Sequence, residues 1–394
     1  MVKTQGSSVG KYIGNELEYV KQVLESDVRS ATSGGWTERF ERQFADRFGV
    51  RYAIAHNSGT SALHTCLRAA GVHAGDEVIS PALTVIMNAF ATLYEGAVPV
   101  FADVDRDTFN IDPADLRRRI TPRTKAIMTV SLYGLSADLD PIMRIAADHG
   151  LTVIEDNAEC LLGMYKGRLA GTSGHMSMFS FENSKHISVG EGGMAITNDP
   201  LLAERIRKSG GIGYKNLTPE GGRIRLKDDV FQDPDYERHD CLGWNYRMTE
   251  VCAAVGVAQL ERVEEIVRLR QANAQCYAEA IEGCDWLIPQ CVPAGYTNTF
   301  WTYAVRYEGL AALKVSWQQF RQKYKEMGGD GFYAAWQVPY REPALGGLGY
   351  ENGLCPVAEE LQQRIMQFKT NYREVDLVRA KAEALRNTVK HFDG

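Results

Sequence analysis

Lys185 is the residue whose surroundings most directly indicate covalent chemistry. It lies in a polar, glycine-containing segment between two apolar runs, Met176–Phe181 and Met194–Thr197, both of which have the composition of short strands. A buried ammonium group is costly unless it is paired, whereas a neutral lysine amine is a nucleophile that forms Schiff bases with carbonyl compounds. We therefore interpret Lys185 as an amine that bonds a carbonyl group. The alternative is a surface lysine in a Gly-rich hairpin.

Asp156 places a carboxylate at the end of another apolar run, which begins at Thr152. A carboxylate in this position can hold a proton on the nitrogen of a heterocyclic ring. A solvated loop acid or a helix cap is the structural alternative.

A strand, a turn of small residues and a helix predict an anion site. The segment 52–57 has strand composition, and 62–70 has helical composition. The N-terminus of such a helix offers free N–H groups and the positive end of a dipole, which suits a phosphate. Gly59 and Thr60 would supply N–H groups, and Ser180 would supply a hydroxyl. The alternative for Ser180 is a small residue in a tightly packed strand.

These residues together meet the requirements of pyridoxal phosphate (PLP). This cofactor needs an amine for its aldehyde carbon, a carboxylate for its pyridine nitrogen, a phosphate cradle and contacts to the faces of its ring. Lys185, Asp156 and the phosphate cradle provide the first three. We therefore expect PLP and no metal.

The elements that must position these residues alternate along the chain. Seven apolar segments are predicted strands, and helices separate most of them, which predicts a largely parallel sheet with helices on both faces. Ligands of such sheets bind beyond the carboxyl ends of the strands, where Asn57, Ser58, Asp156 and Lys185 fall. The predicted strands are 52–57, 77–81, 98–103, 125–132, 152–155, 176–181 and 193–197, with helices at 87–94, 113–119 and 140–149.

The remaining segments complete a two-domain prediction. Residues 1–250 form a large PLP-binding α/β domain, and 251–394 a smaller α+β domain. Segment 210–242 is too long for an idle connection, so we expect a substrate or interface loop. The N-terminal helices are predicted at 14–26 and 37–48, with Thr37 and Glu38 at the start of the second. A helix from Val251 to about Ile281, capped by Thr249, joins the domains and precedes a strand at 300–307 and helices at 316–327, 358–367 and 374–389.

Composition narrows the class of protein. The chain has 394 residues and a net charge of −6, and it lacks a basic block, which argues against nucleic acid as a partner. It has no run of 18 apolar residues, and its first residues lack the apolar core of a signal peptide. None of the eight cysteines forms a Cys-x-x-Cys pair, so we expect mostly buried free thiols in a reducing cytoplasm.

The order of several motifs carries a family resemblance. The sequence resembles the DegT/DnrJ/StrS family of PLP-dependent sugar aminotransferases, which has the aspartate-aminotransferase fold (fold type I). The resemblance covers nearly the whole chain. It rests on Ser58–Leu63, Val153–Asp156, Phe179–Phe181 with Lys185, Gly190–Met194, Trp244–Glu250, Gln259 with Leu260, and Cys355–Glu359.

The resemblance implies a role for each matching residue. Lys185 would bond the cofactor and later move a proton between substrate and cofactor, and Asp156 would pair with the pyridine nitrogen. Asn245 is similar to an asparagine that reaches the phosphate in the neighbouring subunit, which implies a homodimer with shared sites. The residues that would hold the phosphate are Gly59, Thr60 and Ser180.

Three positions depart from the family pattern. Val85 stands where an aromatic residue often stacks on the cofactor. Glu159 stands where Gln or His is usual near the cofactor's ring oxygen, and its charge would repel a phenolate-type oxygen unless it is protonated or turned away. Glu182-Asn-Ser184 replaces the commoner His-Pro-Thr before the lysine.

The activity implied is transfer of an amino group from L-glutamate to a keto-sugar. The acceptor is either a nucleotide-linked keto-deoxysugar or a free keto-sugar acid such as an 8-oxo octulosonate, for surface polysaccharide or lipopolysaccharide. Candidates for sugar contacts are Tyr214, Trp301, Gln337 and Tyr340, and each has a packing role as its alternative.

Two other functions remain open. A sugar dehydratase of the same family would carry histidine in place of Lys185, and here His186 merely follows the lysine. A non-catalytic regulatory or binding homologue would have lost Lys185, Asp156 or Ser180, and all three are present.

Overall fold

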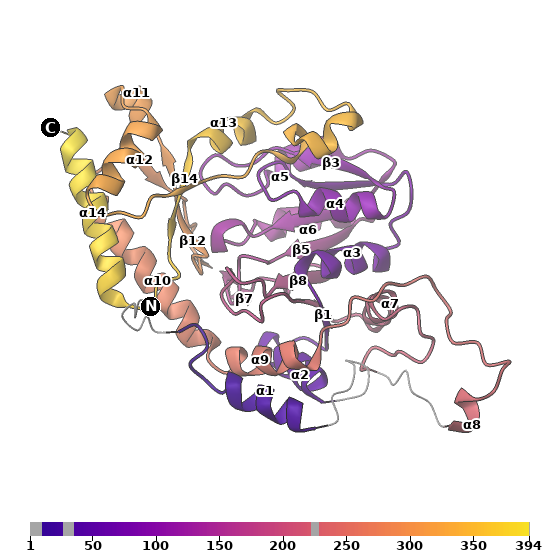
Figure 1. Cartoon of the computed structure of the whole chain (residues 1–394). Helices are drawn as coiled ribbons and strands as arrows, with labels where there is room; N and C mark the ends of the chain where they lie inside the picture. Colours follow the sequence, from indigo (N-terminus) through magenta and orange to yellow (C-terminus); the bar gives the residue numbers. More distant parts are fainter. Residues whose placement is uncertain (1–9, 27–34, 222–227, 394) are drawn as a thin grey trace.

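A seven-stranded sheet in the order β1-β9-β8-β5-β4-β2-β3 organises the structure, which is a computed structural model describing residues 10–26, 35–221 and 228–393 (Figure 1). Strands β8, β5, β4, β2 and β3 all run parallel to one another, whereas β9 runs antiparallel to the two strands beside it, β8 and β1. The predicted mostly parallel sheet is confirmed. The strands are β1 (Tyr52–His56), β2 (Glu77–Pro81), β3 (Val98–Ala102), β4 (Thr124–Val130), β5 (Thr152–Asp156), β8 (Met176–Ser180) and β9 (Gly193–Thr197).

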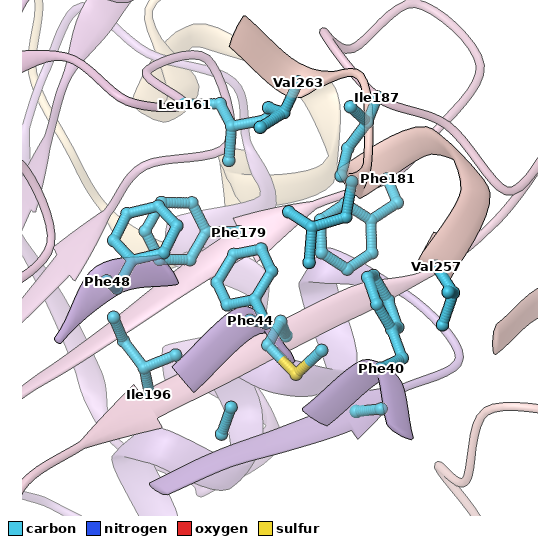
Figure 2. Close-up of a cluster of buried hydrophobic side chains, with 14 of the residues drawn as sticks. Phe40, Phe44, Phe48, Leu161, Phe179, Phe181, Ile187, Ile196, Val257 and Val263 are labelled. Atoms are coloured by element: carbon cyan, nitrogen blue, oxygen red, sulfur yellow. The ribbon is translucent and has the colours of Figure 1, made fainter. Parts of the chain in front are cut away.

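Helices cover both faces of this sheet. Alternate residues of β1 show the division, since Ile54 packs into the cluster under α3 and α7, and Ala55 packs into the cluster under α2. Figure 2 shows the second cluster, in which Phe44 of α2 meets Phe179 of β8. The covering helices are α2 (Trp36–Phe48), α3 (Gly59–Ala69), α4 (Met87–Tyr94), α5 (Pro113–Arg119), α6 (Leu139–His149) and α7 (Pro200–Gly210).

The C-terminal part forms a second sheet in the order β10-β12-β14-β13, whose neighbouring strands are antiparallel. Aromatic side chains, including Tyr277, Phe320 and Phe368, fill the core between this sheet and its helices. In Figure 1 the second sheet lies to the left of the central sheet with α12 and α14, and α13 lies above the central sheet. Its elements are β10 (Leu287–Pro289), β12 (Thr302–Tyr307), α11 (Gly309–Leu313), α12 (Trp317–Glu326), β13 (Tyr333–Ala334), η2 (Pro339–Arg341), η3 (Pro343–Leu348), α13 (Pro356–Arg364), β14 (Ile365–Lys369) and α14 (Val375–Asp393).

A small three-stranded sheet and a short 3₁₀ turn complete the described elements. The sheet has the order β11-β6-β7, and the turn η1 directly follows β4. Their bounds are η1 (Leu132–Gly134), β6 (Met164–Tyr165), β7 (Arg168–Leu169) and β11 (Tyr296–Thr297).

The long helix predicted from Val251 to about Ile281 is two helices. α9 (Glu250–Leu260) and α10 (Val263–Ala280) are separated by Glu261 and Arg262. α9 packs against α1 (Glu16–Glu25) and α2, whereas α10 packs against α14 and β12. α9 and α10 therefore pack against different parts of the structure. The helical periodicity of the sequence continues through both helices and does not reveal the break between them.

The predicted helix at 358–367 is wrong at its end. α13 stops at Arg364, and β14 pairs with β12 and β13. Ile365, Met366 and Phe368 are buried in this sheet. Tertiary pairing therefore decides the conformation of a segment whose local pattern also suits a helix.

Segment 210–242 contains one short helix in its described part, α8 (Asp228–Phe231), which projects from the body in Figure 1. Residues 222–227 lie outside the described residues. Bridges from Gly211 to Asn245 and from Tyr214 to His239 connect the two ends of the segment. The role of this loop stays a prediction.

The eight cysteines are all free thiols, but Cys66, Cys160 and Cys355 alone are buried, whereas Cys241 and Cys291 are exposed and the other three are partly exposed. The expectation that most of the thiols are buried is therefore wrong. Within the described ranges, no helix is both long and apolar enough to cross a bilayer.

Candidate active site

A cavity of about 1020 Å³ opens at the carboxyl ends of β5 and β8. Its walls come from the central sheet and the start of α3 on one side and from the C-terminal part on the other. This volume is large enough for a cofactor together with part of a substrate. Six of the seven predicted catalytic and cofactor-binding residues line it: Gly59, Thr60, Asp156, Glu159, Ser180 and Lys185.

The start of α3 forms one end of this cavity. The hydroxyl of Ser58 accepts a hydrogen bond from the N–H of Ser61 (3.1 Å), and Oγ of Ser61 accepts one from the N–H of Ser58 (3.1 Å). This reciprocal cap leaves the N–H groups of Gly59 and Thr60 for a ligand, at the positive end of the helix dipole. A Cβ at position 59 would lie 3.0 Å from Cβ of Ser180, so glycine allows the close approach. The arrangement can bind a phosphate.

Asp156 ends β5 and is 3% exposed. Oδ1 accepts a hydrogen bond from the N–H of Ala158 (3.0 Å), and Oδ2 accepts one from Nδ2 of Asn88 (3.1 Å). Burial raises the pKa of Asp156 to about 6, and its two hydrogen bonds and the nearby Lys185 amine oppose this rise only in part. A buried carboxylate with neutral donors, at the wall of a cavity, suits a cationic ring nitrogen.

The amine of Lys185 lies between a carboxylate and an indole ring. Its Nζ is 3.4 Å from Oε1 of Glu159 and 4.6 Å from the centroid of the Trp301 ring. Oε2 of Glu159 accepts a hydrogen bond from the N–H of Tyr133 (3.0 Å). Glu159 is thus turned toward the lysine and held there from its other side.

The loop that carries Lys185 is fixed by two further residues. The carboxylate of Glu182 accepts hydrogen bonds from the N–H (2.7 Å) and the hydroxyl (2.6 Å) of Ser184. Arg270 of α10, which is buried, donates to the carbonyl oxygens of Ser184 (2.9 Å), Lys185 (3.0 Å) and Trp301 (2.8 Å). The departure from the family pattern at 182–184 therefore supplies a hydrogen-bonded turn before the lysine.

Sequence reasoning does not identify Arg270 or Asn88. A signal exists for Arg270, because Ile266, Arg270, Asn273 and Tyr277 recur at helical spacing and all are buried. The helical spacing therefore predicts that Arg270, a charged residue, lies on the buried face of its helix. Nothing in the sequence separates Asn88 from the other residues of α4.

The predicted sugar-contact candidates divide into two pairs. Trp301 and Gln337 line the cavity, whereas Tyr340 and Tyr214 do not. Tyr340 is buried and donates its hydroxyl to Oε1 of Glu359 (2.7 Å), so it has the packing role that was the alternative. The ring of Tyr214 packs against a neighbouring imidazole.

Several aromatic side chains line the cavity, although residue 85 is not one of them. Val85 lines the wall as an aliphatic side chain, and Phe90 and Trp301 line it as well. Tyr333 and Trp336 also belong to the lining and are exposed by more than half of their surface.

Asn245 and His186 both lie outside this lining. Asn245 is exposed, and its carbonyl oxygen accepts a hydrogen bond from Nδ2 of Asn57 (3.5 Å). His186 is buried, with Nε2 at 2.9 Å from the carbonyl oxygen of Thr299, and burial lowers its pKa well below the usual value. The histidine beside the lysine is therefore a packing residue.

Comparisons with known proteins bear on this geometry. The model of the DegT/DnrJ/EryC1/StrS aminotransferase family matches residues 11–374. The chain belongs to this family. It is 42% identical over 305 residues to a GDP-perosamine synthase of Caulobacter vibrioides, covering 76% of this chain and 77% of the relative. It is 40% identical over 268 residues to a GDP-perosamine synthase of Escherichia coli O157:H7, covering 68% and 69% of the two chains.

A solved structure extends the likeness to the fold. The aminotransferase from Psychrobacter cryohalolentis superposes with a TM-score of 0.85 and 30% identity, covering 96% of this chain and 97% of that chain. The predicted family and the fold of the PLP-dependent transferases are therefore confirmed.

The family membership makes this chain a PLP-dependent aminotransferase. The residues present fit the cofactor: the amine of Lys185 and the buried carboxylate of Asp156 line one cavity, and the glycine at position 59 lets the start of α3 lie against Ser180, where a Cβ would crowd that side chain. The cofactor prediction is thus confirmed.

Proposed function

We propose that this enzyme moves the amino group of L-glutamate to the keto group of a nucleotide-linked keto-deoxysugar. The observation that carries the proposal is that Lys185, Asp156 and the start of α3 line one cavity in a chain that is 42% identical to a GDP-perosamine synthase. This relative favours a nucleotide-linked acceptor over a free keto-sugar acid such as an 8-oxo octulosonate. The product would serve surface polysaccharide or lipopolysaccharide synthesis in the cytoplasm.

The roles of the site residues follow from their positions. Bound PLP supplies an electron sink that lets an amino group leave one substrate and join another. Lys185 carries the proton that each half-reaction must move, because its amine reaches into the cavity. Asp156 would hold the proton of the ring nitrogen. The N–H groups of Gly59 and Thr60 and the hydroxyl of Ser180 would hold the phosphate.

We also propose a homodimer in which Asn245 of one subunit reaches the phosphate bound by the other. Asn245 is exposed and does not line the cavity of its own chain, which is compatible with a role in a second copy. The acceptor would be selected at the wall that the C-terminal part contributes, where Trp301 and Gln337 lie.

A spectroscopic screen tests the activity. The protein loaded with PLP should be yellow, and L-glutamate should bleach this colour as the amino group moves onto the cofactor. Addition of the correct keto-sugar should restore the colour, so a GDP-linked keto-deoxysugar and a free keto-sugar acid are the two informative acceptors. Persistent colour with every amino donor tried would contradict transamination, and recovery only with the free acid would overturn the nucleotide-linked acceptor.

The variant Lys185→Ala tests the role of the lysine. It should lose steady-state transamination completely while its circular dichroism spectrum and oligomeric state stay those of the wild type. In the wild type, borohydride reduction with PLP should label the peptide that contains Lys185, as peptide mass spectrometry will report. A label on any other lysine would refute the assignment.

A further inference from the structure

The charge at position 159 is the feature of this site that the proposed reaction does not explain. By the family resemblance a Gln or His is usual at this position, where a negative charge has no evident use, yet Glu159 is buried and makes two contacts. Its Oε1 faces Nζ of Lys185 at 3.4 Å, and its Oε2 accepts the N–H of Tyr133 at 3.0 Å.

We propose that Glu159 is a positioning residue that holds the ammonium form of Lys185 whenever the lysine is not bonded to a carbonyl group. The proposal rests on the proposed role of Lys185 and deepens it. A lysine that moves a proton must spend part of each cycle as a cation, and a carboxylate at 3.4 Å stabilises that cation in a poorly solvated place.

The surroundings of Lys185 support this assignment. The indole of Trp301 lies 4.6 Å below the same Nζ and also attracts a cation. Arg270 fixes the carbonyl oxygen of Lys185 at 3.0 Å, so the side chain starts from a fixed point. The Lys185 and Glu159 side chains are 15% and 7% exposed, so salt screens their attraction only weakly.

The backbone conformation of Tyr133 helps to fix the carboxylate of Glu159. Tyr133 has φ of 60°, a left-handed conformation that is strained for a large side chain. In this conformation its N–H meets Oε2 of Glu159. The strained turn therefore fixes one oxygen of the carboxylate and leaves the other for the lysine.

Other charged groups near Glu159 do not replace it. Asp156 already accepts hydrogen bonds from Ala158 and Asn88, and Arg270 is a cation that is committed to three carbonyl oxygens. The charged and titratable groups that face the carboxylate are Asp156 on β5, Cys160 beyond it, Tyr133 in η1, Lys185 after β8 and Arg270 on α10.

The decisive comparison is between Glu159→Gln and Glu159→Asp in the cofactor-free full-length protein. Glutamine keeps the volume and can still accept the N–H of Tyr133, so it removes the charge and keeps the turn. Aspartate keeps the charge. Trace acetic anhydride acetylates neutral amines only, and mass spectrometry of the Lys185 peptide gives the rate at each pH.

We expect Lys185 to be acetylated about tenfold faster near neutral pH in Glu159→Gln than in the wild type, because the neutral amine no longer competes with an ion-paired ammonium form. Glu159→Asp should return this rate most of the way to that of the wild type. Glu191→Gln, which changes an exposed carboxylate at the cavity rim, is the matched control and should leave the rate unchanged.

An unchanged or lower acetylation rate of Lys185 in Glu159→Gln would overturn the proposal, and so would an aspartate variant that behaves like the glutamine variant. If the glutamine variant fails to fold, Glu159→His provides a side chain that is neutral at alkaline pH and is common at this position in the family. The measurement needs no cofactor. A failure of the PLP reaction at Lys185 would therefore be seen separately, in the borohydride experiment.

Discussion

Asp156 is a residue whose function opposes the stability of the cofactor-free fold. Burial raises its pKa to about 6, above the value of about 4 for an aspartate in an unfolded chain. The folded state therefore binds the proton more tightly than the unfolded state. The stabilisation due to this group is fully present below pH 4 and is lost as the pH rises through 6. At pH 8 the ionised side chain costs on the order of 2 kcal/mol.

The variant Asp156→Asn should therefore stabilise the cofactor-free protein. Its melting temperature should exceed that of the wild type by several degrees at pH 8, and the difference should shrink toward zero near pH 4 because the wild-type carboxyl is then protonated. Differential scanning fluorimetry at both pH values measures the difference. Asp235→Asn changes an exposed aspartate and should show no such gain. A gain that is equal at both pH values would show that the charge is not its cause.

The sequence predicts a site residue only where the residues next to it in the chain already indicate its position. Lys185 and Asp156 follow apolar strands directly, so their types and positions sufficed. The contact of Glu159 with Lys185 requires two loops to meet, and Arg270 approaches from a helix about 85 residues further along the chain. Contacts between such distant segments depend on tertiary packing, which local patterns do not encode.

At the scale of elements, two helices are capped by acids from distant segments. The sequence places the start of the second helix at Thr37 with a local cap. The helix instead begins at Trp36, whose N–H donates to Oε2 of Glu250 (2.6 Å), while Thr37 donates its hydroxyl to Oε1 (2.7 Å). Thr249 caps α9 through the N–H of Cys252 (3.2 Å), as predicted. Glu250 of the Trp244–Glu250 motif thus ties α9 to α2.

Asp103 performs the same task for α13. Its Oδ1 accepts the N–H of Ala358 (2.8 Å), and its Oδ2 accepts the N–H of Val357 (3.0 Å), at the start of a helix that has no side-chain cap of its own. α13 leads directly into β14, which carries Gln367 to the cavity wall. The cap therefore joins the central sheet to one wall of the site.

The variant Asp103→Ala should destabilise the protein by about 1–2 kcal/mol, because the buried N–H of Ala358 and the partly buried N–H of Val357 lose their acceptor. The melting temperature should fall by a few degrees, and Asp103→Asn, which retains one acceptor oxygen, should lose less. Asp235→Ala serves as the surface control. Equal melting temperatures for Asp103→Ala and the wild type would show that water or another group caps α13.

Short elements of the central layer were easier to predict than the elements that follow residue 250. The strands Gly193–Thr197 and Glu77–Pro81 and the helices Met87–Tyr94 and Pro113–Arg119 match the sequence prediction to the residue, because a short run between polar, proline or glycine residues leaves little choice. The break between α9 and α10 and the strand β14 were missed. Both depend on which layer the segment packs against, and the proposed boundary at residue 250 precedes a helix that packs on the N-terminal helices.

At the scale of the whole molecule, the surface around α1 exposes several large apolar side chains. Leu17 and Leu24 of α1 are 83% and 66% exposed, seven residues apart on the same face of the helix. Tyr12 and Ile13 nearby are about half exposed. Exposed apolar side chains gathered in one region are typical of a protein interface, and they support the proposed homodimer.

Mixed dimers test whether the sites are shared. Lys185→Ala should be inactive and Asn245→Ala should lose most of its cofactor, since each proposed site needs Lys185 from one subunit and Asn245 from the other. After the two variants are mixed, unfolded and refolded together, half of the dimers should combine them and contain one intact site. About a quarter of wild-type activity should return.

A mixture of Lys185→Ala with Asp156→Ala is the control that should stay inactive, because these two residues line the same cavity and every dimer then lacks one of them at each site. Full activity of Asn245→Ala alone, or no recovery in the first mixture, would contradict a site built from two subunits.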